Sequence, residues 1–281
     1  MLTTMEAIAK ATAYLQGKGV ASPRLDAEVL LGHILHWDRL RLYMEPRRPL
    51  TEEERAAYER LILQRGRRVP VAYLTGEKEF LSRPFFVNED VLIPRPETEL
   101  LVEAVMDLCR GHETMVDVGT GSGIIAISLK LALPASRVLA IDISPAALAV
   151  ARRNAARHGA HVEFLQGDLL EPIDEPVEII ISNPPYIPRG DLGGLAPEVG
   201  YEPALALDGG ADGLDYYKRL LEQARDKIRP GGYLALEIGW GQGEAILELA
   251  RSPWRRGQIR EDYQGIPRVL LLERGTDDAA D

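Results

Sequence analysis

The sequence predicts an α/β protein with a mostly parallel sheet, preceded by a small N-terminal helical bundle. Three observations lead to this prediction. From about residue 97 the chain alternates helical and strand patterns, as parallel sheets covered by helices do. The segment "VDVGTGSG" places three glycines between the first strand of that series and a helix. The first seventy residues, in contrast, carry only helical patterns.

Composition places the chain among ordinary globular proteins. Its 281 residues allow one large domain and a small one, and 46% hydrophobic with 27% charged residues is typical of that class. No stretch approaches the ~20 apolar residues of a membrane span, and the first residues lack the pattern of a secretory signal. The single cysteine, Cys109, cannot form an internal disulfide, so we expect a cytoplasmic protein.

The net charge of -10 is unevenly distributed. Residues 1–70 carry 12 Lys/Arg and 9 Asp/Glu, a balance of +3, and the rest of the chain carries 21 and 34, a balance of -13. An enzyme acting on nucleic acid usually has a basic domain around its substrate, so the acidic larger domain disfavours a duplex DNA substrate. The five histidines are scattered, so we expect no metal site. We also expect no membrane contact and a monomer.

Helix start signals recur in residues 1–70. Thr3 and Thr51 are each followed three residues later by a glutamate, which is the capping-box pattern. Ser22 precedes Pro23, a cap residue followed by proline at the first helical position. We therefore expect three or four short helices that form a domain for docking the substrate.

Residues 71–96 contain prolines, glycine and short apolar-aromatic pieces, and they predict a hairpin and a linker. Residues 97–274 form the larger domain, and residues 275–281 are expected to be a disordered tail. Seven strands are predicted in the larger domain, at residues 115–119, 137–143, 162–168, 177–182, 231–239, 258–263 and 268–274. The helices between and beside them are expected at residues 97–110, from about 124, and at 145–159, 213–228 and 242–251.

The glycine loop indicates a nucleotide-type cofactor. Gly119, Gly121 and Gly123 follow the first strand, and glycine there lets the backbone turn sharply and approach a ligand. The third glycine comes one residue early for the G-x-G-x-x-G pattern of dinucleotide sites. The loop alone therefore leaves open both a dehydrogenase cofactor and S-adenosylmethionine.

Two carboxylates end the next strands. Asp142 lies 23 residues after Gly119, at the distance where an acidic side chain accepts hydrogen bonds from ribose hydroxyls. The alternative is that Asp142 caps the following helix, although Ser144 suits that role better. Asp168 ends the third strand, near the expected place of an adenine.

The tetrapeptide "NPPY", Asn183 to Tyr186, ends the fourth strand. It could be a simple turn. However, the Asn183 oxygen and the Pro184 carbonyl are two adjacent acceptors, which match a planar –NH₂ group with two hydrogens. Pro185 stiffens the segment, and the ring of Tyr186 can pack on a planar amide or base. This pattern predicts methylation of an –NH₂ nitrogen and disfavours a dehydrogenase, because no proton donor for hydride chemistry is evident at this strand.

Together, "DVGTGSG", Asp142 and "NPPY" resemble a Rossmann-like class I S-adenosylmethionine-dependent methyltransferase. "SPRLDAEVLL", "LIPRPETE", "SNPPYIP" and "YEPALALDGGADGLDYYKRL" are similar to the release-factor glutamine methyltransferases, the PrmC/HemK family, over about residues 5–274. The resemblance implies methyl transfer to the glutamine of the Gly-Gly-Gln loop of class I peptide chain release factors, in translation termination. The product is then N(5)-methylglutamine.

The resemblance also implies residue roles. Asn183, Pro184 and Tyr186 are expected to be catalytic, and with Pro185 they bind the substrate amide. The cofactor is expected to contact these residues: Gly119, Thr120, Gly121, Ser122, Gly123, Asp142, Asp168, Leu169 and Asn183. Leu169 stands where the family often has an aromatic residue, so a stacking contact with the adenine is lost.

Arg95, Glu97 and Glu99 either lie near the site or cap a helix, and the sequence leaves both roles open.

Two other functions remain possible on the sequence. A nucleic-acid adenine methyltransferase shares the NPPY motif, but it needs a basic, aromatic-rich domain for base flipping, which the small N-terminal bundle does not resemble. A non-catalytic binding module is disfavoured by the intact glycine loop, Asp142 and NPPY. Methyl transfer from labelled S-adenosylmethionine distinguishes an enzyme from such a binding module.

Overall fold

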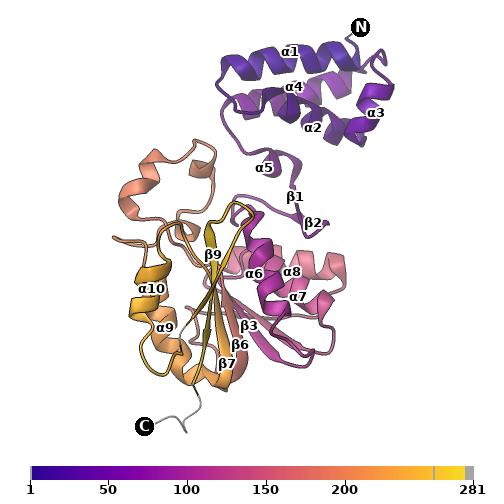
Figure 1. Cartoon of the computed structure of the whole chain (residues 1–281). Helices are drawn as coiled ribbons and strands as arrows, with labels where there is room; N and C mark the ends of the chain where they lie inside the picture. The colour runs from indigo at the N-terminus through magenta and orange to yellow at the C-terminus, as the bar shows by residue number, and fades with distance from the viewer. Residues whose placement is uncertain (1, 256, 276–281) are drawn as a thin grey trace. The chain divides into compact units, whose positions relative to one another are not determined.

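The computed structural model describes residues 2–255 and 257–275. The chain divides into two compact units, shown by the ribbon in Figure 1. The helical unit comprises Met1–Glu77 and Ala196–Tyr201, and the sheet unit comprises Lys78–Leu195 and Glu202–Asp281. The expected boundary at residue 70 therefore lies a few residues earlier than the division in the structure. The predicted tail, residues 275–281, lies outside the described residues except for Gly275.

The helical unit is a bundle with its own apolar core. Thr3 and Thr51 form the predicted capping boxes. Pro23 is the first residue of its helix as predicted, but the Ser22 side chain makes no capping hydrogen bond. Leu15, Leu30, Leu31 and Leu42 are fully buried in this core. Its helices are α1 Thr4–Gly17, α2 Pro23–Leu35, α3 Arg39–Met44, α4 Glu52–Gly66 and α5 Val71–Thr75.

A later part of the chain completes the helical unit. Glu198 accepts hydrogen bonds from the guanidinium groups of Arg65 and Arg68, all at 2.7 Å. Arg65 also donates to Asp26, and the Tyr201 hydroxyl donates to the carbonyl of Arg67. These contacts explain why Ala196–Tyr201 belongs with the helices rather than with the sheet that flanks it in sequence.

The sheet unit contains the expected seven strands in one sheet of order β5-β4-β3-β6-β7-β9-β8. The first five strands of that order are parallel, and β9 runs antiparallel to both of its neighbours. The predicted hairpin is also present, as β1 Glu77–Phe80 and β2 Arg83–Phe86. The sheet strands are β3 Thr114–Val118, β4 Arg137–Asp142, β5 Glu163–Gln166, β6 Val177–Ser182, β7 Ile228–Glu237, β8 Gln258–Glu261 and β9 Pro267–Glu273.

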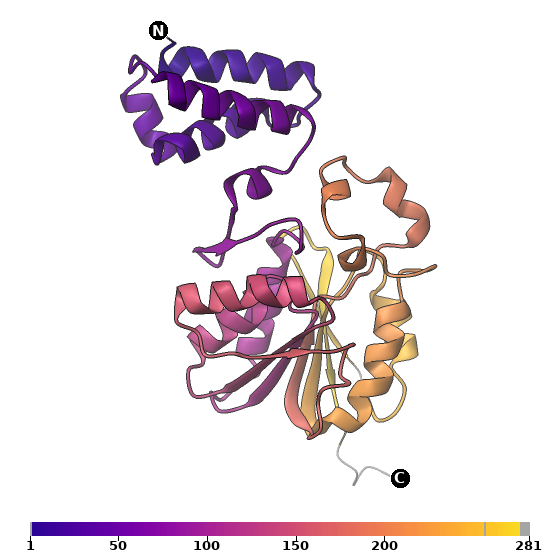
Figure 2. The same ribbon diagram turned by 180° about the vertical axis from the view of Figure 1, so that it is seen from behind.

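Helices cover both faces of this sheet, as Figures 1 and 2 show. Successive strand residues point to opposite faces, so Met115 belongs to one apolar core and Val116 to the other. Helices α6 and α7 pack on the first core, and α9 and α10 pack on the second. The helices are α6 Glu97–Met106, α7 Ile124–Ala132, α8 Pro145–His158, α9 Asp215–Lys227 and α10 Gly243–Leu249, with 3-10 turns at Arg189–Gly194, Val199–Tyr201 and Ala204–Ala206.

The predicted elements are all present, with shifted ends. Helix α6 stops at Met106 rather than at residue 110, and β7 begins at Ile228, three residues before its predicted start. Within the described residues, no helix is long and apolar enough to cross a membrane.

Candidate active site

The glycine loop joins β3 to α7 in a conformation that requires glycine. Gly119, Gly121 and Gly123 have φ angles of 73°, 54° and 84°, in the left-handed region that L-residues rarely adopt. The N–H groups of Gly119 and Thr120 donate to the carbonyl of Ile141, which ties the loop to the neighbouring strand. A Cβ atom at Gly119 or Gly121 would meet no atom within 4 Å, because both residues border an open cavity.

Asp142 fixes the loop from the end of β4. One carboxylate oxygen accepts from the Gly121 N–H at 2.9 Å, and the other accepts from the Ser144 N–H at 2.9 Å. Burial raises the pKa of Asp142. Ser144, and not Asp142, caps α8 by accepting from the Ala147 N–H. Asp142 therefore holds the loop and borders the cavity with lone pairs still free to accept from a ligand.

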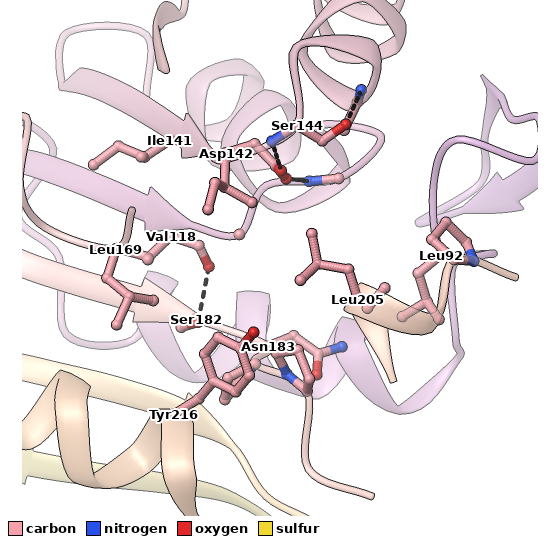
Figure 3. A pocket seen from close by; sticks show the side chains of 18 of the residues that line it. Leu92, Val118, Ile141, Asp142, Ser144, Leu169, Ser182, Asn183, Leu205 and Tyr216 are labelled. Carbon is pink, nitrogen blue, oxygen red and sulfur yellow. Dashed lines mark hydrogen bonds between the residues drawn. The ribbon is translucent and has the colours of Figure 1, made fainter. Parts of the chain in front are cut away.

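The cavity lies beyond the carboxyl ends of the parallel strands, where ligands bind in open α/β sheets. It contains about 910 Å³ of space between atoms, a figure that includes open solvent at its mouth. Figure 3 shows its lining, which is mostly apolar with Asp142 and Asn183 at opposite sides. The lining comprises Asp90, Val91, Leu92, Val118, Gly119, Gly121, Ile141–Ser144, Ala147, Gly167–Leu169, Ser182–Pro185, Pro203, Leu205, Ala206 and Tyr216.

Asn183 follows directly after β6, as the sequence predicts. The Ser182 hydroxyl donates to the Val118 carbonyl at 2.8 Å, so the ends of β6 and β3 are held side by side. Asn183, Pro184 and Pro185 all line the cavity. This arrangement brings the glycine loop, Asp142 and the first three residues of NPPY into one cavity.

Tyr186, in contrast, does not line this cavity. Its carbonyl accepts from the Gln242 side chain at 2.9 Å, and burial raises the pKa of its hydroxyl to about 12. Added Cβ atoms at Gly209 and Gly213 would lie 2.8 Å and 2.4 Å from Tyr186 backbone atoms. Glycines thus permit the close packing that holds the end of NPPY.

Three loop residues predicted to contact the cofactor also lie outside the lining. The Thr120 hydroxyl donates to Asp117 at 2.6 Å, the Ser122 carbonyl accepts from Asn154, and Gly123 precedes α7. A Cβ at Gly123 would lie 3.1 Å from the Cβ of Ala151. These residues hold the loop on the side that faces away from the cavity. Burial raises the pKa of Asp117, which accepts from Thr120, to about 7.

Relatives of similar sequence match nearly the whole chain. A release factor glutamine methyltransferase from Moorella thermoacetica is 46% identical, covering 97% of this chain and 99% of the relative. One from Geobacter sulfurreducens is 44% identical, covering 92% of each chain. The chain belongs to the release factor glutamine methyltransferase family. It is a methyltransferase, and its predicted Rossmann-like fold is confirmed.

Domain and structure comparisons agree with this membership. The PrmC N-terminal domain matches residues 6–76, and the methyltransferase small domain matches residues 96–192. The fold resembles a crystal structure of a methyltransferase from Pyrococcus furiosus, with a TM-score of 0.54 and 20% identity over 68% of this chain and 89% of that one. A ribosomal protein L11 methylase from Lactobacillus delbrueckii gives a TM-score of 0.50 and 22% identity, over 64% and 79%.

The adenine side predicted for this methyltransferase contains Asp168 and Leu169, and both line the cavity. Asp168 accepts from Arg219 at 2.6 Å. Leu169 has a φ angle of 52°, a left-handed conformation that costs a non-glycine residue about 1–2 kcal/mol. Tyr216 of α9 borders the same part of the cavity, as Figure 3 shows, and sequence reasoning missed it.

Arg95, Glu97 and Glu99 do not line the cavity. Arg95 donates to Glu202, Glu97 begins α6, and Glu99 accepts from the Leu81 N–H at 2.8 Å. Glu202 also accepts from the Ile93 N–H at 3.0 Å. The two family-like segments "LIPRPETE" and "YEPALAL" are therefore joined through Glu202. The first supplies Leu92 to the cavity wall, and the second supplies Pro203, Leu205 and Ala206.

Proposed function

We propose that this chain transfers the methyl group of S-adenosyl-L-methionine to the side-chain amide nitrogen of a glutamine, in the Gly-Gly-Gln loop of class I peptide chain release factors. The product is N(5)-methylglutamine, with S-adenosyl-L-homocysteine released. The observation that carries the proposal is the single cavity bordered by Gly119, Gly121, Asp142 and Asn183. The relatives' names supply the substrate.

The cavity fits the cofactor through three features. Side-chain-free Gly119 and Gly121 leave space along the loop. Asp142 offers carboxylate oxygens to the ribose hydroxyls, next to the backbone donors it holds. Tyr216 gives an aromatic face beside Leu169, where the adenine is expected. Thus Tyr216 compensates for the stacking that Leu169 does not supply.

The chemistry then depends on how Asn183 and Pro184 hold the substrate amide. When bound, the cofactor supplies an electrophilic methyl group on a sulfonium sulfur, and that sulfur keeps the bonding electron pair as the methyl leaves. Asn183 Oδ1 and the Pro184 carbonyl accept the two hydrogens of the glutamine –NH₂, which aims the nitrogen and favours the positive charge that develops on it. The methylated nitrogen then loses one proton to solvent, because that proton becomes acidic as the positive charge develops.

The test combines a purified class I release factor with labelled S-adenosylmethionine and locates the methyl group by mass spectrometry. We expect one methyl group on the glutamine of the Gly-Gly-Gln loop and none on duplex DNA. Methylated adenine with an unmodified glutamine would overturn the proposal and favour the nucleic-acid alternative.

The same assay tests Asn183. Asn183→Ala removes one amide acceptor but leaves Asp142 and the loop unchanged, so the cofactor should still bind. Loss of a preorganised hydrogen bond at a reacting centre lowers turnover on the order of a hundredfold to a thousandfold. Turnover within threefold of wild type would remove the clamp from the mechanism.

A further inference from the structure

A buried hydrogen-bond chain lies behind Asn183. The Asn183 side-chain nitrogen donates to the Thr98 hydroxyl oxygen at 3.2 Å, and the Thr98 hydroxyl donates to a Glu237 carboxylate oxygen at 2.7 Å. Thr98 is fully buried and Glu237 is 2% exposed. The three residues come from the end of β6, the first turn of α6 and the end of β7, so only the fold brings them together.

The chemistry of the three groups fixes which one donates and which one accepts in each of these hydrogen bonds. An ionised carboxylate only accepts hydrogen bonds, so the single hydrogen of the Thr98 hydroxyl is committed to Glu237. The Thr98 oxygen can then only accept, and Asn183 must present its –NH₂ group to it. The amide oxygen of Asn183 is consequently directed to its other side, where the residue borders the cavity.

Such control matters because an asparagine amide is nearly symmetrical in shape. Rotation by 180° about the last side-chain bond would exchange the oxygen and the –NH₂ with little steric change. An –NH₂ facing the substrate –NH₂ would place donor against donor, and the clamp would lose one of its two acceptors. Nothing in the Asn183 side chain itself prevents this rotation, so a neighbouring group must hold the amide.

We propose that Thr98 and Glu237 are positioning residues that hold the Asn183 amide with its oxygen toward the substrate. The proposal rests on the methyl-transfer function proposed above. It assigns a role to Thr98, within "IPRPETE", and to Glu237, within "LALEIG", neither of which contacts the cavity.

The charge state of Glu237 gives a second test of the proposal, the dependence of turnover on pH. The pKa of Glu237 is raised to about 7, chiefly by burial and also by Glu97, although Thr98, Arg268 and Arg95 act to lower it. The tyrosines near it are Tyr186 and Tyr217, and the Tyr217 hydroxyl donates to the Glu237 carbonyl at 2.9 Å. Protonated Glu237 can donate to Thr98, which frees the Thr98 hydrogen and removes the constraint on Asn183. Turnover should therefore fall as the pH decreases through about 7.

The experiment compares Thr98→Val, Thr98→Ser, Glu237→Gln and wild type in the full-length chain. Turnover is measured with saturating labelled S-adenosylmethionine and purified release factor, and cofactor affinity is measured by calorimetry. Ser128→Ala is the matched control, because Ser128 of α7 is a buried hydroxyl without a hydrogen-bond partner among the described residues.

We expect Thr98→Val to lower kcat on the order of tenfold with cofactor affinity unchanged, since one hydrogen bond that orients the amide is lost. Thr98→Ser should restore kcat, and Ser128→Ala should match wild type. Glu237→Gln should flatten the pH dependence of kcat near 7, because glutamine does not titrate.

Equal kcat for folded Thr98→Val and Thr98→Ser, with wild type active on the release factor, would overturn the positioning role. An unchanged pH profile in Glu237→Gln would also contradict it. Failure of wild type to methylate the release factor would instead overturn the proposed function, so the two failures are distinguishable.

Discussion

At the scale of single residues, Asp142 both holds the glycine loop and borders the cavity. Its carboxylate accepts from Gly121 and Ser144 while bordering the cavity. Its place was predictable, because a residue that ends the strand after a glycine loop lies at the same edge of a parallel sheet as that loop. Residues 119–123 were only partly predictable. The sequence does not reveal that the Thr120 hydroxyl is bound by Asp117, or that the Ser122 carbonyl is bound by Asn154.

Asp142→Ala should weaken cofactor binding with less effect on folding. Loss of a charged acceptor costs about 1.5–3 kcal/mol, which is about a tenfold to hundredfold rise in Kd. Calorimetry with S-adenosylmethionine measures it, and Asp142→Asn, which keeps one acceptor, should lie between Ala and wild type. An unchanged Kd in Asp142→Ala would show that the carboxylate serves only the loop and the start of α8.

Tyr216 tests the adenine side of the cavity. Base–aromatic stacking is worth about 1–3 kcal/mol by alanine substitution, so Tyr216→Ala should raise the cofactor Kd about fivefold to a hundredfold. Tyr216→Phe keeps the ring and should bind like wild type. Equal Kd values for the Ala and Phe variants would place the adenine elsewhere.

At the scale of elements, the strands and helices followed from periodicity, but the contacts that join distant segments did not. Thr98 and Glu237 are 139 positions apart, and Ile93 and Glu202 are 109 apart. No local pattern encodes such pairs. Glu202 is 7% exposed and holds both the Ile93 N–H and Arg95, so it links two walls of the cavity.

Glu202→Ala should destabilise the sheet unit, because it leaves the buried Ile93 N–H without its acceptor. An unsatisfied buried donor costs about 1–3 kcal/mol in the free energy of unfolding. Urea denaturation measures this loss. Glu163→Ala is the control: it breaks the exposed ion pair with Arg137, and such surface pairs are worth less than about 1 kcal/mol. Similar losses in the two variants would show that Glu202 contributes no more than a surface charge.

At the scale of the whole molecule, each unit has a separate apolar core. Buried residues of the helical core end at Ile62, and those of the two sheet cores begin at Phe80. The change from helical to alternating patterns predicted this organisation. The return of Ala196–Tyr201 to the helical unit was not predictable, because it depends on Glu198 meeting Arg65 and Arg68 more than 100 positions away.

Because each unit has its own core, we expect the sheet unit to fold without the helical unit, and a truncated chain can test this. We expect residues 78–281 to fold and bind S-adenosylmethionine with near wild-type affinity, because every cavity residue lies in the sheet unit. Methylation of an intact release factor should fall sharply, because the helical unit that we expect to dock it is gone. Circular dichroism, calorimetry and the labelled transfer assay measure the three properties.

Truncation also removes Arg65 and Arg68, the partners of Glu198. The effect of losing these contacts alone must therefore be measured separately. Glu198→Ala in the full-length chain breaks the ion pairs with Arg65 and Arg68 but keeps the helices. If docking by the helical unit limits methylation, this variant should retain more transfer than residues 78–281. Equal losses would assign the defect to the Ala196–Tyr201 segment, and a folded truncated chain without cofactor binding would contradict the independence of the sheet unit.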